Sequence, residues 1–171
     1  MRIKLFGFYL TVDYSFFLML SFAVLLGAES IIDLLIYSAL HESGHFFLLL
    51  VCGGKPDSLK LSYYGLALRY STPLSKAKEC LVLLAGPFVN LVLYLLLKNE
   101  INLLLFVLNM LPVYPIDFGR VIRLFSYRLS KVLGCITLAL LIPLAVYMLV
   151  VYKSFSLIFI VCYLIIYSFN Y

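Results

Sequence analysis

The sequence predicts an all-α membrane protein with about six transmembrane helices and a membrane-associated β-hairpin between the second and third. First, the mean hydropathy is +1.11, and 65% of the residues are hydrophobic while 12% are charged, which lies outside the range of soluble domains. Second, apolar runs of about 20 residues, the length that spans a bilayer, follow one another along the chain. Third, little sequence lies between them, so we expect a single membrane domain over residues 1–171.

Hydropathy and length place the six apolar segments. They lie near 14–28, 31–52, 77–97, 101–122, 132–152 and 154–170. The first segment could also be a secretory signal, because Arg2 and Lys4 precede it. We favour an uncleaved span, because Asp13 interrupts the early apolar run and removal of residues 1–28 would leave five spans.

Positive charge is distributed unevenly between the loops. Lys98 and Lys153 alone fall on one predicted side, and the other eleven basic residues fall on the opposite side: Arg2, Lys4, Lys55, Lys60, Arg69, Lys76, Lys78, Arg120, Arg123, Arg128 and Lys131. Basic residues are retained in the cytoplasm, so we expect both termini there, in a multi-pass membrane protein. Topology therefore explains the net charge of +5, and we expect no nucleic-acid partner.

The loop between the second and third segments has a strand-like pattern. Apolar and other residues alternate over residues 58–70 around Gly65, which predicts a β-hairpin. Aromatic residues prefer the depth of the lipid headgroups, so an interfacial loop anchored by Tyr63, Tyr64 and Tyr70 is the alternative.

The second segment carries the strongest chemical signal, the pentapeptide H-E-S-G-H at residues 41–45. Its histidines, His41 and His45, are the two histidines of the chain. Four residues turn a helix through about 400°, so both imidazoles lie on one face and can share a metal ion. Glu42 points about 100° away, where a carboxylate can accept a proton from water without coordinating the ion. This spacing is typical of zinc hydrolases.

A third metal ligand is expected, because a catalytic zinc usually takes three protein ligands. Asp117 is the single carboxylate within the apolar segment 101–122. Pro112 and Pro115 disfavour helix before it, so this segment should unwind where Asp117 lies. Irregular backbone at membrane depth is tolerated around a buried polar site. The sequence thus predicts one zinc ion bound by His41, His45 and Asp117.

The two motifs, H-E-S-G-H and N-M-L-P-V-Y-P-I-D-F-G-R at residues 109–120, resemble the hallmark motifs of the site-2 protease family of intramembrane zinc metalloproteases. The six-span layout resembles the stage IV sporulation protein FB type. The resemblance implies that His41, His45 and Asp117 bind zinc, that Glu42 is the general base, and that the protein cleaves peptide bonds in or near transmembrane segments of membrane-associated substrates.

The resemblance has two departures. Phe118 follows the aspartate where family members commonly have glycine, although Gly119 and Arg120 match. The sporulation branch often carries a nucleotide-sensing domain after its last span, and the residues up to Tyr171 hold none. We therefore expect no nucleotide ligand, and the partners we expect are a membrane protein substrate, the lipid bilayer and a regulatory membrane protein.

Two asparagines are further candidates for the site. The segment A-G-P-F-V-N at residues 85–90 resembles another family motif, whose asparagine faces the active site. Asn90 and Asn109 are candidate contacts for the substrate or the transition state, because an amide donor can stabilise an oxyanion. Alternatively, both asparagines hydrogen bond between helices, as polar residues in spans often do.

Other functional classes remain open at this point. The exposed edge of the hairpin at residues 58–70 could bind an extended substrate by main-chain pairing. The alternative to an enzyme is a non-catalytic membrane protein that binds or transports metal, or that holds membrane segments as a scaffold. Glu42 favours the enzyme, because it is a carboxylate suited to proton transfer and the motif around it is complete.

Overall fold

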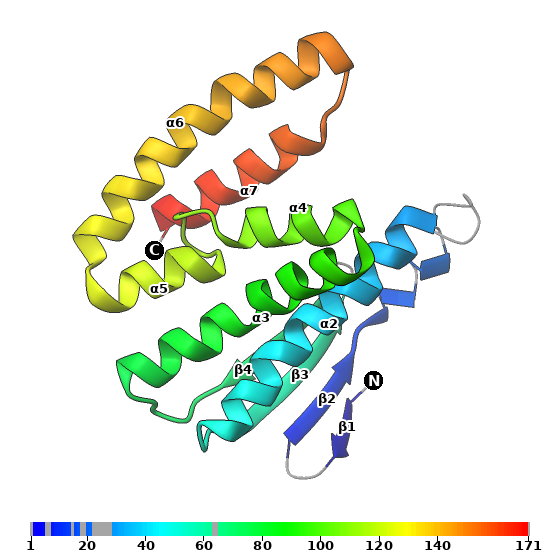
Figure 1. Ribbon diagram of the computed structural model, residues 1–171, viewed down its shortest axis with the longest axis vertical. Helices are drawn as coiled ribbons and strands as arrows, with labels where there is room; N and C mark the ends of the chain where they lie inside the picture. The colour runs from blue at the N-terminus through cyan, green and yellow to red at the C-terminus, as the bar shows by residue number, and fades with distance from the viewer. Residues whose placement is uncertain are drawn as a thin grey trace. The chain divides into compact units, whose positions relative to one another are not determined.

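The computed structural model describes residues 2–5, 8–14, 16–17, 20–21, 29–62 and 65–170 (Figure 1). The chain forms two compact units, Met1–Phe106 and Val107–Tyr171. The single domain expected from the sequence stays a prediction.

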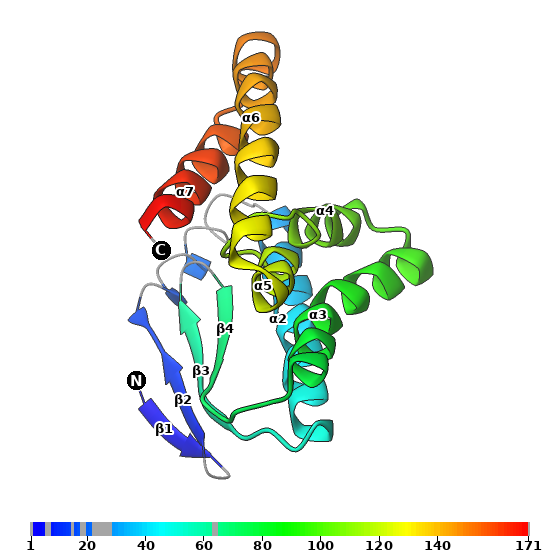
Figure 2. The same ribbon diagram turned by 90° about the vertical axis from the view of Figure 1, so that its left-hand side faces the viewer.

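A sheet of four strands belongs to the first unit (Figure 2). The strands are β1 (Arg2–Leu5), β2 (Phe8–Val12), β3 (Pro56–Ser62) and β4 (Gly65–Tyr70), in the spatial order β1-β2-β3-β4. The β3–β4 pair is antiparallel, which confirms the hairpin predicted at residues 58–70. Strands β1 and β2 are not predicted by the sequence pattern. They pair with each other antiparallel, and β2 runs parallel to β3.

The first unit also contains two long helices, α2 (Glu29–Val51) and α3 (Lys76–Leu97). They lie side by side, with the sheet against α2 (Figures 1 and 2). Gly44 permits this close packing, because a Cβ atom there would lie 2.7 Å from Val89 Cγ2 and 3.0 Å from the Ala85 carbonyl oxygen. Small residues at a helix contact let the backbones approach in this way.

The fourth apolar segment is broken. Helix α4 covers Glu100–Asn109 and helix α5 covers Asp117–Phe125, with non-helical chain between them. The interruption predicted within the segment 101–122 is therefore confirmed, although it lies just before Asp117 and not at Asp117 itself. Its position follows from Pro112 and Pro115, which lack the N–H that a helix requires. Asp117 itself is the first residue of α5.

The second unit is built from α5, α6 (Tyr127–Tyr152) and α7 (Ser156–Asn170). Helix α6 packs against both α5 and α7. The buried residues Val113, Leu138 and Leu164 form its core. Because Val113 lies in the chain before α5, this core also holds the segment that leads into Asp117.

Among the described residues, three helices are long and apolar enough to cross a membrane, and they lie at Ser30–Val51, Lys76–Leu97 and Tyr127–Tyr152. They correspond to the second, third and fifth predicted spans. The fourth and sixth segments contain the shorter apolar helices Glu100–Asn109 and Leu157–Tyr167. The predicted first span at 14–28 falls mostly outside the described residues. The composition of the three long helices supports a membrane protein, and the count of six spans stays a prediction.

Candidate metal centre

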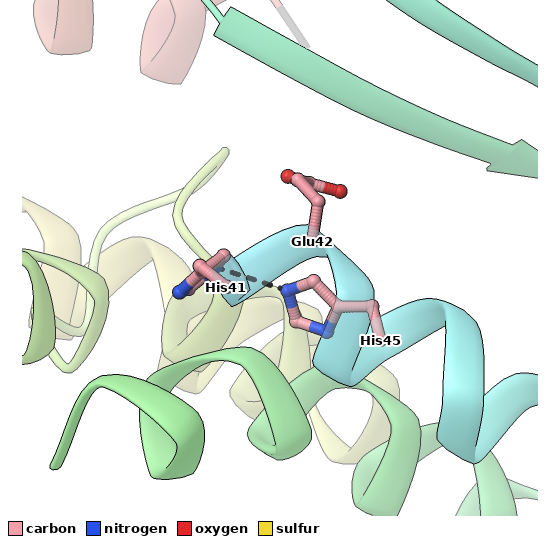
Figure 3. Close-up of side chains that lie close together, drawn as sticks. All are labelled: His41, Glu42 and His45. Carbon is pink, nitrogen blue, oxygen red and sulfur yellow. Dashed lines mark hydrogen bonds between the residues drawn. The ribbon is translucent and has the colours of Figure 1, made fainter. Parts of the chain in front are cut away.

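The two histidines form a buried pair on one face of α2. His41 and His45 are each 6% exposed, and their Nε2 atoms lie 3.1 Å apart. The rings meet edge to face, with an interplanar angle of 83°, so that both Nε2 atoms point at the same place (Figure 3). The prediction that a four-residue spacing brings the imidazoles together is confirmed.

The other ring nitrogen of each histidine, Nδ1, is hydrogen bonded to a group on α3. His45 Nδ1 lies 2.7 Å from the carbonyl oxygen of Val82, and His41 Nδ1 lies 3.1 Å from Asn90 Oδ1. A carbonyl oxygen only accepts hydrogen bonds, so Nδ1 of His45 carries the hydrogen and Nε2 of the neutral ring presents a lone pair. Asn90 Oδ1 is likewise an acceptor and favours the same tautomer for His41.

Gly86 provides the space in which the two Nε2 atoms converge. A Cβ atom at this position would collide with His45 Nε2 and would lie 2.6 Å from His41 Nε2. Two nitrogen ligands on a tetrahedral zinc ion are about 3.3 Å apart, given a Zn–N distance of about 2.0–2.1 Å. The separation of the imidazoles and the missing side chain at residue 86 therefore fit a zinc ion.

Glu42 lies beside the imidazole pair and points toward the sheet (Figure 3). One ligand atom from each of His41, Glu42 and His45 lies within 4.8 Å of the others. The Glu42 carboxylate is half-buried, and its Oε2 accepts a hydrogen bond of 3.3 Å from the backbone N–H of Leu68 in β4. The carboxylate is thus near the imidazoles but oriented by a strand rather than by the helix that carries it.

This hydrogen bond shows which backbone N–H groups of β4 point away from β3. Leu68 stands opposite Leu59 in the β3–β4 pair, and N–H groups along an antiparallel strand alternate between the partner and the outer edge. Since Leu68 donates to Glu42, its N–H faces outward. Strand β4 is the last strand in the order of the described sheet, so its outer edge runs past Glu42.

An apolar cavity of about 240 Å³ lies against the N-terminal half of α2 in the first unit. Its lining comes from the segment before α2, from α2 and from β3: Phe16, Leu20, Ile32, Leu35, Ile36, Ala39 and Leu61. Ala39 precedes Glu42 by three residues, which places both on one side of the helix. The cavity therefore continues the α2 surface on which the carboxylate lies.

Asp117 and Asn109 belong to the second unit. Asp117 is 8% exposed, and its Oδ1 lies 3.8 Å from Nη1 of Arg120, one turn further along α5. The first turn of a helix favours a negative charge, so the carboxylate is in a position that stabilises its ionised form. Asn109 is the half-buried last residue of α4. The roles of Asp117 and Asn109 at the metal centre stay predictions.

The segment before Asp117 is held closely against α5. A Cβ atom at Gly119 would collide with the Val113 carbonyl group and would lie 2.7 Å from the Tyr114 nitrogen. The Arg123 guanidinium lies 4.2 Å from the centroid of the Tyr114 ring, a cation–π contact. Phe118, the departure from the family pattern, is half-buried. This packing requires a glycine at residue 119, where the chain has one, and not at residue 118.

Sequence reasoning missed three contributors to the centre. Gly86 stands in the segment that resembles a family motif, and its spacing from Asn90 places both on one face of α3. The Val82 carbonyl and the Leu68 N–H are backbone groups, which every residue type supplies. The sequence therefore held a signal for Gly86 and none for the other two.

Of three comparisons with known proteins, the one with solved structures found a similar fold. No protein-family model matches the sequence, and no curated protein matches it. Among solved structures, the chain is similar to a site-2 protease from Methanocaldococcus jannaschii, with a TM-score of 0.66 and 21% sequence identity. The similarity covers 99% of this chain and 94% of that one. The chain therefore has the fold of a site-2 protease, as the two motifs predicted.

Proposed function

We propose that this chain, which has the fold of a site-2 protease, is an intramembrane zinc metalloendopeptidase of that family. The observation that carries the proposal is the convergence of His41 and His45 Nε2, 3.1 Å apart on a helix of membrane-spanning length, with Glu42 beside them. Ionisable groups within a membrane span are energetically costly, so their presence there indicates a function. Their arrangement here is that of a hydrolytic metal centre.

The proposed zinc ligands are His41, His45 and Asp117. A zinc ion supplies Lewis-acid chemistry, because it lowers the pKa of water and polarises a carbonyl group. Glu42 takes a proton from the attacking water and passes it to the amine nitrogen that leaves when the peptide bond breaks. The hydrogen bond from Leu68 orients the Glu42 carboxylate for this transfer.

The proposed substrate is a membrane-associated protein cut within or near a transmembrane segment. Such a segment must leave its helix before its peptide bonds can be attacked. The outer edge of β4 offers backbone groups to an extended chain beside Glu42. The apolar cavity suits the side chains of a membrane segment, since a cavity of about 150 Å³ already accommodates benzene and this one measures about 240 Å³.

The remaining parts of the proposal follow from the sequence. Both termini lie in the cytoplasm because of the uneven distribution of basic residues. The proposed location is a bacterial cell membrane, and the proposed type within the family is that of the stage IV sporulation protein FB. A regulatory membrane protein is the further partner we propose.

The test compares newly formed protein N-termini in matched cells that express the wild type or Glu42→Gln. We expect N-termini at or near transmembrane segments in the wild type that are absent from the variant. Glu100→Gln is the control, because Glu100 is an exposed residue at the start of α4; it should give the wild-type set. If Glu42→Gln yields the same N-termini as the wild type, Glu42 is not the general base.

A further inference from the structure

Three positions of α3 form one stripe beneath the imidazole pair. Val82, Gly86 and Asn90 succeed one another at four-residue spacing, which places them on one face of a helix. Val82 meets His45 through its carbonyl oxygen, Gly86 leaves room for both Nε2 atoms, and Asn90 meets His41 through Oδ1. Each imidazole therefore has its own acceptor on α3.

The two acceptors differ in how firmly they determine the tautomer. The Val82 carbonyl oxygen can only accept a hydrogen bond, and as a backbone group it is present whichever side chain stands at residue 82. The Asn90 side chain presents an acceptor oxygen and a donor nitrogen from the same planar group. If the nitrogen faced His41 Nδ1, the hydrogen of the neutral ring would move to Nε2, which could then no longer bind a metal ion.

Burial gives this contact further weight. Asn90 is 0% exposed, and its Nδ2 atom has no hydrogen-bond partner within the part of the chain that the structure describes. A buried amide is unfavourable unless its polar atoms are bonded. The bond from His41 Nδ1 to Asn90 Oδ1 is the interaction that is present in this centre.

We propose that Asn90 is a positioning residue, which accepts a hydrogen bond from His41 Nδ1 and thereby holds His41 Nε2 toward the metal ion. This inference rests on the proposed function and differs from the role of transition-state donor considered from the sequence. A positioning residue acts on metal affinity, whereas a transition-state donor acts on the rate of the chemical step alone.

The test measures zinc affinity of the purified full-length protein by competition with a chelator of known affinity. Asn90→Leu removes the acceptor at similar size, and we expect about 10- to 100-fold weaker zinc binding, the usual effect of losing a group that orients a ligand. Asn90→Asp retains an acceptor oxygen, and we expect affinity within a few-fold of wild type. The visible spectrum of the cobalt-substituted protein should change for Asn90→Leu and not for Asn90→Asp.

Asn102→Leu is the matched control. Asn102 is also 0% exposed, and neither atom of its amide has a hydrogen-bond partner among the described residues. Its replacement removes a buried amide of the first unit that makes no contact with an imidazole through a hydrogen bond. We expect wild-type zinc affinity and an unchanged cobalt spectrum.

The outcomes separate the two proposals. Wild-type zinc affinity and an unchanged cobalt spectrum in Asn90→Leu, with a lower kcat, would overturn the positioning role and favour a contact with the transition state. Equal loss in Asn90→Leu and Asn90→Asp would also overturn it, because the acceptor would then be irrelevant. A wild-type protein that binds no zinc would refute the metal centre itself.

Discussion

The backbone N–H of Leu68 donates a hydrogen bond of 3.3 Å to the carboxylate of Glu42. This contact joins the edge of the sheet to the residue proposed as the general base. An extended substrate paired with β4 would place its backbone next to the same carboxylate. Binding and proton transfer would then depend on one strand.

Leu68→Pro tests this dependence. Proline removes the outward N–H but no bond of the β3–β4 ladder, and edge strands tolerate proline at such positions. We expect at least about 10-fold slower cleavage with zinc content retained, given that general base catalysis contributes about 10²- to 10⁴-fold. Leu68→Val keeps the N–H and should cleave like the wild type. Equal rates for the two variants would show that the bond is irrelevant.

Removal of the metal should abolish cleavage reversibly. The Nε2 atoms of His41 and His45 lie 3.1 Å apart, a separation that suits two ligands of one cation. We expect a chelator such as 1,10-phenanthroline to stop cleavage, zinc to restore it, and magnesium to fail, because magnesium prefers oxygen ligands. Cleavage and metal content are measured in parallel. Full activity in a metal-free sample would exclude a zinc mechanism.

Gly86→Ala should displace both imidazoles. The new Cβ atom would occupy the space where the two Nε2 atoms converge, and we expect at least about 10-fold weaker zinc binding, comparable to other disturbances of ligand orientation. Leu81→Ala, at an exposed position of the same helix, controls for general effects on α3. Circular dichroism checks that both variants keep their helices. Normal zinc affinity in Gly86→Ala would contradict the geometry.

Asp117→Asn tests the third ligand. The substitution preserves size and removes the charge, so we expect zinc affinity to fall by more than about 100-fold, since residues that only orient ligands account for about 10- to 100-fold. Asp57→Asn, at an exposed position in β3, is the control. A variant at residue 117 that holds zinc as tightly as the wild type would remove Asp117 from the ligand set.

Gly119→Ala should destabilise the segment that leads into α5, because the added Cβ atom would overlap the Val113 carbonyl group. Overpacking of this kind costs about 1–3 kcal/mol. Phe118→Leu should have a smaller effect, because it keeps an apolar residue of good helix propensity. Thermal unfolding in detergent measures both. A larger loss for Phe118→Leu would mean that residue 118 determines the local packing.

Local patterns in the sequence predicted the centre of the site well. The spacing of His41 and His45 determines their relative direction once α2 is a helix, and the structure has them together. Pro112 and Pro115 likewise predicted the interruption before α5. These predictions depend on a few neighbouring residues and on backbone rules alone.

Contacts between distant segments were harder to predict. Strands β1 and β2 are short, with basic residues in β1, a pattern that equally fits the flank of a membrane span. Strand β2 pairs in parallel with β3, which lies about half the length of the first unit further along the chain. A parallel pair has no tight turn between its strands, so no turn sequence predicts it. The bonds to the Val82 carbonyl and from the Leu68 N–H involve backbone groups, which have no signature in the sequence.

The parallel pair of β2 and β3 also constrains how the chain threads through a bilayer. Strands of one small sheet lie on the same side of the membrane, because an open sheet edge does not cross hydrocarbon. The chain between them must therefore cross an even number of times. Helix α2 is long and apolar enough for one crossing, and the span expected at residues 14–28 would supply the second. The pairing of Tyr9 with Ser58 thus requires that a membrane crossing by α2, the helix that carries His41 and His45, be accompanied by a second crossing between β2 and β3.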